Sequence, residues 1–222
     1  MDIIAQEFKT PGNIGAIARA MKNFGFTQLI LLNPKCDHLC KEARDRASHA
    51  EDILRDAKVV SELKYDTLIG TTAILGTDYN LRRNPIFPET LGKMQIKGKV
   101  GLIIGRENDG MHNEELEACD ILVTIPVTKK YPTMNASHAA AVIMYEVFKH
   151  SKEEKIGEKI KGATKEDKER LEKLFEEKMN ILPFNTEQKK QTQRLVWKKL
   201  IGKSQLTKRE LMAIYGFMKK IK

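Results

Sequence analysis

The chain has 222 residues, of which 41% are hydrophobic and 31% are charged, and its formal net charge is +9 at pH 7. This length allows one full domain and a small second module, and the hydrophobic share suffices for a buried core. No apolar run reaches the roughly 18 residues of a membrane-spanning helix, and the N-terminal MDIIAQEFKTPG lacks the basic and apolar regions of a signal peptide. We therefore expect a cytoplasmic protein without a membrane segment.

The first 150 residues alternate between strand-like and helix-like patterns. Apolar runs predict strands at residues 3–5, 28–32, 59–60, 67–73, 100–104 and 121–125. Helical spacing predicts helices at residues 14–24, 37–47 and on to about 54, 89–94, 113–119 and 136–149, with a turn-rich segment at 76–88. Continuous apolar strands separated by helices predict an α/β fold, with a parallel sheet covered by helices on both faces.

The composition changes after residue 150. Residues 151–164 are poor in apolar side chains and predict a linker. Three helices are expected in residues 165–222, because three positions suit helix N-caps: Thr164, either Asn185 or Thr186, and Thr207. Asp167 stands three residues after Thr164, and Glu210 stands three residues after Thr207, as in a capping box. Their expected apolar positions are Leu171, Leu174 and Phe175, then Leu195, Val196 and Leu200, then Leu211, Ile214, Tyr215 and Met218. The sequence thus predicts a small all-α module at the C-terminal end.

The net charge comes from this tail. Residues 1–150 contain 19 basic and 19 acidic side chains, whereas residues 151–222 contain 20 and 11. A neutral body with a basic tail is typical of a protein that binds a polyanion, and the alternative is a solvated lysine-rich surface. The candidate contacts are Lys189, Lys190, Arg194, Lys198 and Lys199.

Three cysteines, Cys36, Cys40 and Cys119, show no pairing pattern, so a disulfide framework is not expected. Cys36 and Cys40 flank His38, which raises the alternative of a zinc site. The spacing C-x-H-x-C lacks a second pair of ligands. We therefore favour ordinary reduced cysteines and predict no metal.

The first candidate site begins the helix after the first strand. Asn13 suits an N-cap, and Gly12 and Gly15 would let backbone amides approach an anion closely. Arg19 follows about one and a half turns into this helix. An ordinary strand-to-helix turn with a surface arginine is the alternative.

Further candidates stand where other strands end, which is where parallel sheets bind ligands. They are Thr71, Thr72 and Ala73, then Gly105, Arg106 and Glu107, then Ile125 and Pro126. Gly105 would let a ligand ring lie against the backbone, and Glu107 would accept hydrogen bonds. Thr133, Met134 and Asn135 precede the helix at 136–149, where helix capping alone is the alternative reading.

Four segments resemble, in order and spacing, the motifs of the SPOUT RNA 2′-O-ribose methyltransferases. They are NIGAIARAMKNFG (13–25), GRENDGM (105–111), CDILVTIP (119–126) and TMNASHAAAVIMYE (133–146). The tail is similar to the C-terminal helical extension of the TrmJ branch, which methylates the nucleotide at position 32 of tRNA anticodon loops. The resemblance covers residues 1–150 most specifically.

The resemblance implies a deep trefoil knot in the C-terminal part of the sheet domain, S-adenosylmethionine bound in the knot loops, and a homodimer whose active site draws on both protomers. It implies methylation of the pyrimidine at position 32 in the tRNA anticodon stem-loop. It assigns catalysis to Arg19, Glu107, Thr133 and Asn135, and cofactor binding to Thr71, Thr72, Ala73, Gly105, Arg106, Glu107, Ile125, Pro126, Thr133 and Met134. Asn13, Arg19 and the five basic residues of the tail would contact RNA.

The chain departs from the family at two positions. Thr133 replaces the usual serine, and Ile74 stands where many members have arginine, so that contact to RNA or cofactor is either absent or supplied by Arg82 or Arg83. The group that accepts the hydroxyl proton is left open, because deprotonating a guanidinium group near neutral pH costs much free energy. The other role for Arg19 is to bind the adjacent phosphate. Alternative functions are methylation of another tRNA position or of rRNA, and a catalytically silent RNA-binding protein. A dinucleotide-dependent oxidoreductase is disfavoured, because Gly12 to Gly15 forms no G-x-G-x-x-G motif.

Overall fold

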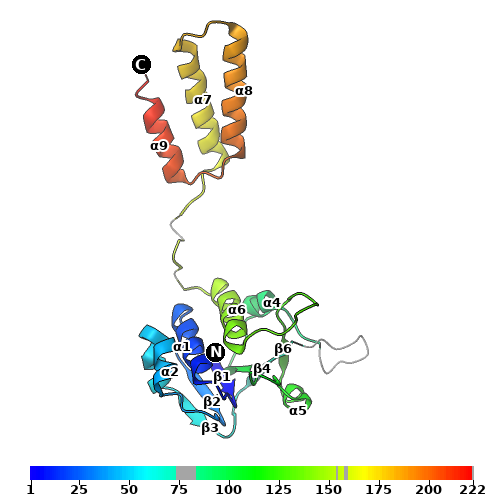
Figure 1. Ribbon diagram of the computed structural model, residues 1–222. Coiled ribbons are helices and arrows are strands. Elements are labelled where there is room, and N and C mark those ends of the chain that lie inside the picture. Colours follow the sequence, from blue (N-terminus) through cyan, green and yellow to red (C-terminus); the bar gives the residue numbers. More distant parts are fainter. Residues whose placement is uncertain (74–83, 154, 158–159, 222) are drawn as a thin grey trace. The chain divides into compact units, whose positions relative to one another are not determined.

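The computed structural model describes residues 1–73, 84–153, 155–157 and 160–221 (Figure 1). The chain divides into two compact units, Met1–Glu153 and Glu154–Lys222, and each is described by itself. Ile74, Arg82 and Arg83 lie outside the described residues. Of the helices described, none is both long and apolar enough to span a bilayer.

The first unit is built on a six-stranded sheet in the order β3-β2-β1-β5-β4-β6, and every pair of neighbouring strands is parallel. The strands are β1 (Asp2–Gln6), β2 (Leu29–Leu32), β3 (Lys58–Val60), β4 (Thr67–Thr71), β5 (Val100–Ile104) and β6 (Ile121–Val123). The predicted parallel sheet is confirmed. β4 and β6 each end two residues earlier than predicted, which leaves Thr72, Ala73 and Ile125 in loops beyond the sheet.

Helices connect the strands: α1 (Pro11–Asn23), α2 (Lys41–Ala47), the 3-10 turn η1 (Ser48–Ala50), α3 (Glu51–Arg55), α4 (Pro88–Lys93), α5 (Asn113–Glu117) and α6 (Ala136–Lys149). The prediction that a helix starts at residue 37 was wrong. The Asp37 carboxylate accepts a hydrogen bond from the backbone N–H of Leu39 at 2.8 Å, which holds a local turn, and α2 starts only after Cys40.

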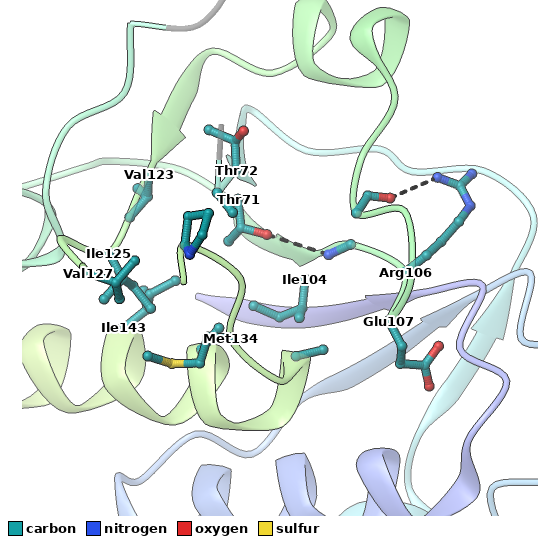
Figure 2. A pocket seen from close by; sticks show the side chains of 16 residues that line it. Thr71, Thr72, Ile104, Arg106, Glu107, Val123, Ile125, Val127, Met134 and Ile143 are labelled. Carbon is teal, nitrogen blue, oxygen red and sulfur yellow. Dashed lines mark hydrogen bonds between the residues drawn. The ribbon is translucent and has the colours of Figure 1, made fainter. Parts of the chain in front are cut away.

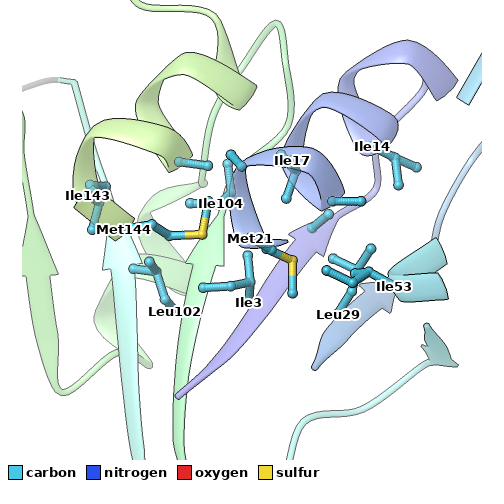
Figure 3. Packing of buried hydrophobic residues seen from close by; sticks show 14 of the residues in the cluster. Ile3, Ile14, Ile17, Met21, Leu29, Ile53, Leu102, Ile104, Ile143 and Met144 are labelled. Carbon is cyan, nitrogen blue, oxygen red and sulfur yellow. The ribbon is translucent and has the colours of Figure 1, made fainter. Parts of the chain in front are cut away.

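Alternate side chains of each strand point to opposite faces of the sheet. On one face, Ile3 of β1 and Leu102 of β5 pack with Met21 of α1 and Met144 of α6 (Figure 3). The other face buries Ile4, Ile30, Leu32, Ile103 and Leu122 together with Met111 and Leu116. Helices therefore cover both faces unevenly, since α5 supplies Leu116 to the second face and α1, α2, α3, α4 and α6 pack on the first.

The second unit contains α7 (Lys165–Ile181), α8 (Glu187–Lys203) and α9 (Lys208–Met218), and α7 packs against both others. Thr164, Thr186 and Thr207 cap these helices, as predicted, by accepting a backbone hydrogen bond from the third helical residue. The end of the predicted linker pairs with the start of α9, because the N–H of Ala163 donates to Leu206 and that of Lys208 to Lys161, each at 2.8 Å.

The apolar residues of α8 differ in burial. Leu195, Val196 and Leu200 are 53%, 41% and 53% exposed, whereas Ile201 is buried. Arg194, Trp197 and Ile201 follow one another at three- and four-residue spacing along the side that faces α7. Leu195 borders the groove on this side, whereas Val196 and Leu200 do not line it.

Candidate functional site

A pocket lies beyond the carboxyl ends of β4, β5 and β6, where their loops meet the start of α6 (Figure 2). Eight of the ten residues expected to bind a cofactor line it: Thr71, Thr72, Ala73, Gly105, Arg106, Glu107, Ile125 and Met134. Pro126 and Thr133 do not line it. Sequence reasoning missed Ile104, Val123, Val127, Pro132, Ala136, Ala139 and Ile143, which are apolar positions that read as core from the sequence alone.

Thr71 ties two strand ends together beneath this pocket. Its hydroxyl donates to the backbone oxygen of Ile103 at 2.9 Å, and the hydroxyl oxygen of Thr71 accepts from the N–H of Gly105 at 3.5 Å (Figure 2). The backbone N–H of Thr72 then donates to Val123 of β6 at 3.0 Å. These contacts fix the loops after β4 and β5 before any ligand arrives.

Gly105 lines the pocket and also serves the turn that follows it. A Cβ atom on this residue would lie 2.7 Å from the carbonyl carbon of Gly110 and 2.8 Å from the nitrogen of Met111. The loop turns back on itself here, with the N–H of Gly110 donating to Arg106 at 3.1 Å, and Gly110 has a φ of 65°. The close approach that demands glycine is therefore that of the turn itself, not of a ligand.

Arg106 closes the same turn through its side chain. Its guanidinium donates to Glu7 at 2.7 Å, to both oxygens of Glu115 at 2.6 and 2.9 Å, and to the carbonyl of Gly110 at 3.2 Å. We call Glu7, Arg106 and Glu115 the arginine clamp. Arg106 lowers the pKa of Glu115 to about 2 and that of Glu7 below its usual range. Arg106 lines the pocket while its guanidinium pairs with these carboxylates, so the expected cofactor contact of this residue stays a prediction.

The neighbouring Glu107 extends to the opposite side of the chain (Figure 2). Its carboxylate accepts hydrogen bonds from the backbone N–H groups of Lys9 at 3.2 Å and Thr10 at 3.0 Å, and from the side-chain amide of Asn13 at 3.4 Å. Glu107 therefore holds the start of α1 against the pocket.

Asn13 joins this contact to α6. Thr10 is the N-cap residue of α1, so the predicted capping role of Asn13 was wrong. Its amide donates to Glu107, and its carbonyl oxygen accepts from the amide of Asn135 at 3.2 Å. The carbonyl oxygen of Asn135 accepts from the N–H and the hydroxyl of Ser137 at 2.9 and 2.6 Å, which caps α6. One chain of hydrogen bonds thus connects the three separate motifs.

The two glycines of the first motif serve helix packing. A Cβ on Gly15 would lie 2.1 Å from the backbone oxygen of Ala43 in α2, and one on Gly12 would lie 2.6 Å from a carboxylate oxygen of Glu42. Close contact between α1 and α2 explains both residues. The expectation that they let backbone amides approach an anion stays a prediction.

Arg19 and Thr133 are exposed, and neither has a hydrogen bond or ion pair with any residue in the described part of the chain. Arg19 lies on α1, one residue after the buried Ala18, and does not line the pocket. The structure therefore brings Glu107, Asn13 and Asn135 together and leaves Arg19 and Thr133 available to a further molecule.

The basic residues of α8 differ in what they contact. Lys189, Lys198 and Lys199 are exposed and Lys190 is half-buried. Arg194 donates to the side chain of Asn180 at 2.8 Å and lies 3.8 Å from Glu176, so it packs on α7 and is a weaker candidate for an RNA contact than expected. The ring centroid of Trp197 lies 4.5 Å from that of Phe175, so this aromatic side chain packs on α7.

Cys36, Cys40 and Cys119 are free cysteines. Burial raises the pKa of the Cys36 and Cys119 thiols to about 11, so neither is a ready nucleophile. Within the described ranges, three or more His, Cys, Asp or Glu side chains nowhere form a group that would hold a metal ion.

The chain is similar to known methyltransferases. The model of the SpoU rRNA Methylase family matches residues 1–145. The tRNA (cytidine-2'-O-)-methyltransferase TrmJ of Methanocaldococcus jannaschii is 37% identical over 227 residues, which cover 99% of this chain and 98% of the relative. The tRNA (cytidine/uridine/adenosine-2'-O-)-methyltransferase TrmJ of Pseudomonas aeruginosa is 41% identical over 146 residues, covering 62% and 56%.

Solved structures with the same fold include a probable methylase family protein from Haemophilus influenzae, with 28% identity and a TM-score of 0.62, covering 99% of this chain and 94% of that one. TrmJ from Z. mobilis aligns with a TM-score of 0.68 at 22% identity and covers 99% and 97%.

Proposed function

Because this chain belongs to the SpoU rRNA methylase family, we propose that it transfers a methyl group from S-adenosylmethionine to a ribose 2′-hydroxyl of tRNA. The observation that carries this proposal is the hydrogen-bond chain from Glu107 through Asn13 to Asn135. It holds the cofactor pocket, the first turn of α1 and the cap of α6 in one arrangement, with Arg19 exposed on the same helix as Asn13.

The pocket suits this cofactor by its chemistry. Ile104, Val123, Ile125 and Ile143 offer apolar walls for an adenine ring, and the strand-end loops offer backbone groups for polar atoms. Glu107 is the one carboxylate among the lining residues, whereas Arg106 is neutralised by Glu7 and Glu115. A ligand with a positively charged sulfur therefore meets no uncompensated cation in this lining.

The bound cofactor supplies a methyl group on a sulfonium ion, which is already a strong electrophile. The protein's main task is therefore to hold the ribose oxygen in line. Arg19 binds an RNA phosphate and stabilises the negative charge that develops on the attacking oxygen, because a guanidinium group stays protonated and pairs with phosphate in two-pronged geometry. The hydroxyl proton leaves to phosphate or water. Asn135 acts by positioning, because it bonds to Asn13 on the helix that carries Arg19, and Thr133 stands in the sequence between the pocket residues Pro132 and Met134.

We propose the pyrimidine at position 32 of the anticodon loop as the target. The relative from M. jannaschii, which matches over nearly the whole chain, is named for cytidine and tRNA. We assign RNA binding to the second unit at residues 165–222, which follows a linker at residues 151–164. Its lysines, the exposed Lys189, Lys198 and Lys199 together with Lys190, would contact the phosphate backbone of the tRNA. A tRNA substrate is also the reason to propose a cytoplasmic site of action.

Two further features of the family are proposals for this chain. A homodimer is supported by Val142 and Tyr145 of α6, which are 36% and 47% exposed on one side of a helix that otherwise packs in the first unit. A trefoil knot over the C-terminal segment is supported by the path of the chain, because β6 lies at one edge of the sheet and α6 then packs against both α1 and α4.

The test is to incubate the protein with labelled S-adenosylmethionine and an unmodified tRNA transcript, and then to map 2′-O-methyl groups. We expect one methyl group at position 32. A transcript with 2′-deoxycytidine at that position is the matched control, because it lacks the reacting oxygen and should incorporate no label. Label in the control would mean that another nucleotide of the tRNA is methylated. Label in rRNA but not in tRNA would favour the rRNA alternative.

A further inference from the structure

The loop between β6 and α6 carries a short turn at the rim of the pocket. The backbone N–H of Tyr131 donates to the carbonyl of Thr128 at 3.2 Å, and the N–H of Lys130 donates to the Thr128 hydroxyl at 3.4 Å. Val127 and Pro132, which flank this turn in the sequence, both line the pocket. The turn therefore presents Lys129, Lys130 and Tyr131 beside the place where the methyl group is delivered.

Tyr131 is 73% exposed, more than any other large apolar or aromatic side chain of the described part of the first unit. Its ring makes no contact with another ring or with a cation in that part of the chain. An exposed aromatic ring on a hydrogen-bonded turn is typical of a recognition surface, since large aromatic side chains are otherwise buried.

We propose that Tyr131 stacks against a base of the RNA loop at or next to the methylated nucleotide, while Lys129 and Lys130 contact its phosphates. This inference rests on the proposed function. An unpaired base is recognised by stacking on an aromatic ring, and lysine side chains add phosphate contacts without sequence preference. The base is joined to the ribose that reacts, so a ring at the rim of the pocket stands where that base or its neighbour must lie. Stacking tolerates any base, so this contact places the nucleotide and does not choose it.

Four variants of the full-length chain distinguish base stacking by Tyr131 from a contact with the cofactor or with a second subunit. Tyr131→Ala removes the ring, Tyr131→Leu keeps apolar bulk without an aromatic face, and Tyr131→Phe keeps the ring. Val59→Ala is the control for loss of an exposed apolar side chain, because Val59 is 58% exposed on β3, at the other edge of the sheet from β6. The measurements are kcat and KM for tRNA, the Kd for S-adenosylmethionine, and the sedimentation coefficient.

We expect Tyr131→Ala and Tyr131→Leu to lower kcat/KM for tRNA by about 10- to 100-fold, the range for loss of one base stack. Tyr131→Phe should restore it, and the Kd for S-adenosylmethionine and the sedimentation coefficient should stay at the wild-type values. An equal loss of cofactor affinity would overturn the proposal and assign the ring to the cofactor. A change of oligomeric state would overturn it in favour of a subunit contact, and wild-type kinetics in Tyr131→Leu would overturn it outright.

A second readout does not depend on methyl transfer. An anticodon stem-loop RNA with 2-aminopurine next to the target nucleotide should lose fluorescence on binding to the wild type and to Tyr131→Phe, but not to Tyr131→Leu. If the wild type quenches this probe yet transfers no methyl group, the proposed function fails while the stacking inference stands. If it transfers methyl groups and all variants quench equally at saturation, the stacking inference fails alone.

Discussion

The side-chain amide of Asn135 donates a hydrogen bond to the carbonyl oxygen of Asn13 at 3.2 Å, across 122 positions of the chain. Asn13 in turn donates to Glu107, so each amide group uses one end as a donor and the other as an acceptor. The link from α1 to α6 therefore depends on an amide at residue 13, because neither a carboxylate nor an apolar side chain is donor and acceptor at once.

Asn13→Asp tests this dependence. The change removes the donor to Glu107 and places two carboxylates within about 3.4 Å, the distance of the present contact. We expect the free energy of unfolding at pH 7 to fall by about 1–3 kcal/mol, and methyl transfer to fall with it. Asn13→Ala is the matched control, since it removes the same hydrogen bonds without adding charge. Denaturant unfolding that shows Asp no less stable than Ala would contradict the proposed chain.

Arg19→Ala is expected to lower kcat for tRNA methylation by at least about 100-fold, the usual effect of losing one charge-stabilising group. The Kd for S-adenosylmethionine should not change, because Arg19 does not line the pocket. Arg19→Lys tells the two roles of this residue apart. Substantial activity in the lysine variant would argue against bidentate binding of a phosphate by Arg19. Weak cofactor binding in either variant would place Arg19 in the cofactor site instead.

The sheet was predictable from the sequence because its strands are short apolar runs with helices between them. The site was predictable in part. The strand-end residues Thr71, Gly105 and Ile125 do line the pocket, as expected for loops that follow parallel strands. The contacts that hold them were not predictable, because Glu107 and Asn13 are 94 positions apart and periodicity carries no information at that range.

Tertiary packing gives several residues contacts that their local sequence does not indicate. Gly12 and Gly15 read as an anion site, yet α2 lies against them. Arg106 reads as a ligand contact, yet two carboxylates surround it. In α8, Leu195, Leu200 and Ile201 are all apolar, yet only Ile201 is buried. In each case the local pattern is compatible with two environments, and a residue far away in the sequence decides between them.

The arginine clamp makes stability depend on pH. The pKa of Glu115 is lowered to about 2 from an ordinary value near 4.5, so its stabilisation is complete above pH 4.5 and is lost as the pH falls toward 2. Converted in full, a shift of this size would be about 3 kcal/mol, but the Glu115 side chain is partly exposed and solvent screening reduces its contribution to about 1–2 kcal/mol. We expect the difference in unfolding free energy between wild type and Glu115→Gln to be near that value at pH 7 and to shrink between pH 5 and pH 3. The exposed Glu114 provides the control, since Glu114→Gln should show a small difference that varies little with pH. A constant difference for Glu115→Gln would rule out the ion pair as its source.

The exposed lysines of α8 should act through salt-dependent binding. Lys198→Gln combined with Lys199→Gln is expected to weaken tRNA binding and to reduce the slope of log K against log salt by about 1.4–1.8, if both side chains neutralise phosphates. Arg194→Gln is the comparison, because Arg194 already pairs with α7, and it should change protein stability more than the salt slope. Filter binding of tRNA at several salt concentrations measures both. An unchanged slope in the double variant would remove α8 from the RNA contact.

Gly15→Ala tests whether α1 is held by close packing. The added Cβ would lie 2.1 Å from the backbone oxygen of Ala43, which cannot move without shifting α2. We expect a loss of about 1–3 kcal/mol of stability, as for other overpacked cores.

Gly12→Ala on the same helix is the matched control, because its Cβ would meet the end of the flexible Glu42 side chain at 2.6 Å, and that carboxylate has room to turn aside. Alanine also favours a helix over glycine by about 0.5–1 kcal/mol, so Gly12→Ala should be neutral or stabilising. Thermal unfolding measures both variants, and equal melting temperatures would mean that the α1–α2 contact is looser than the structure indicates. Since Asn13 and Arg19 lie on this helix, a displaced α1 should also lower methyl transfer in Gly15→Ala and leave it unchanged in Gly12→Ala.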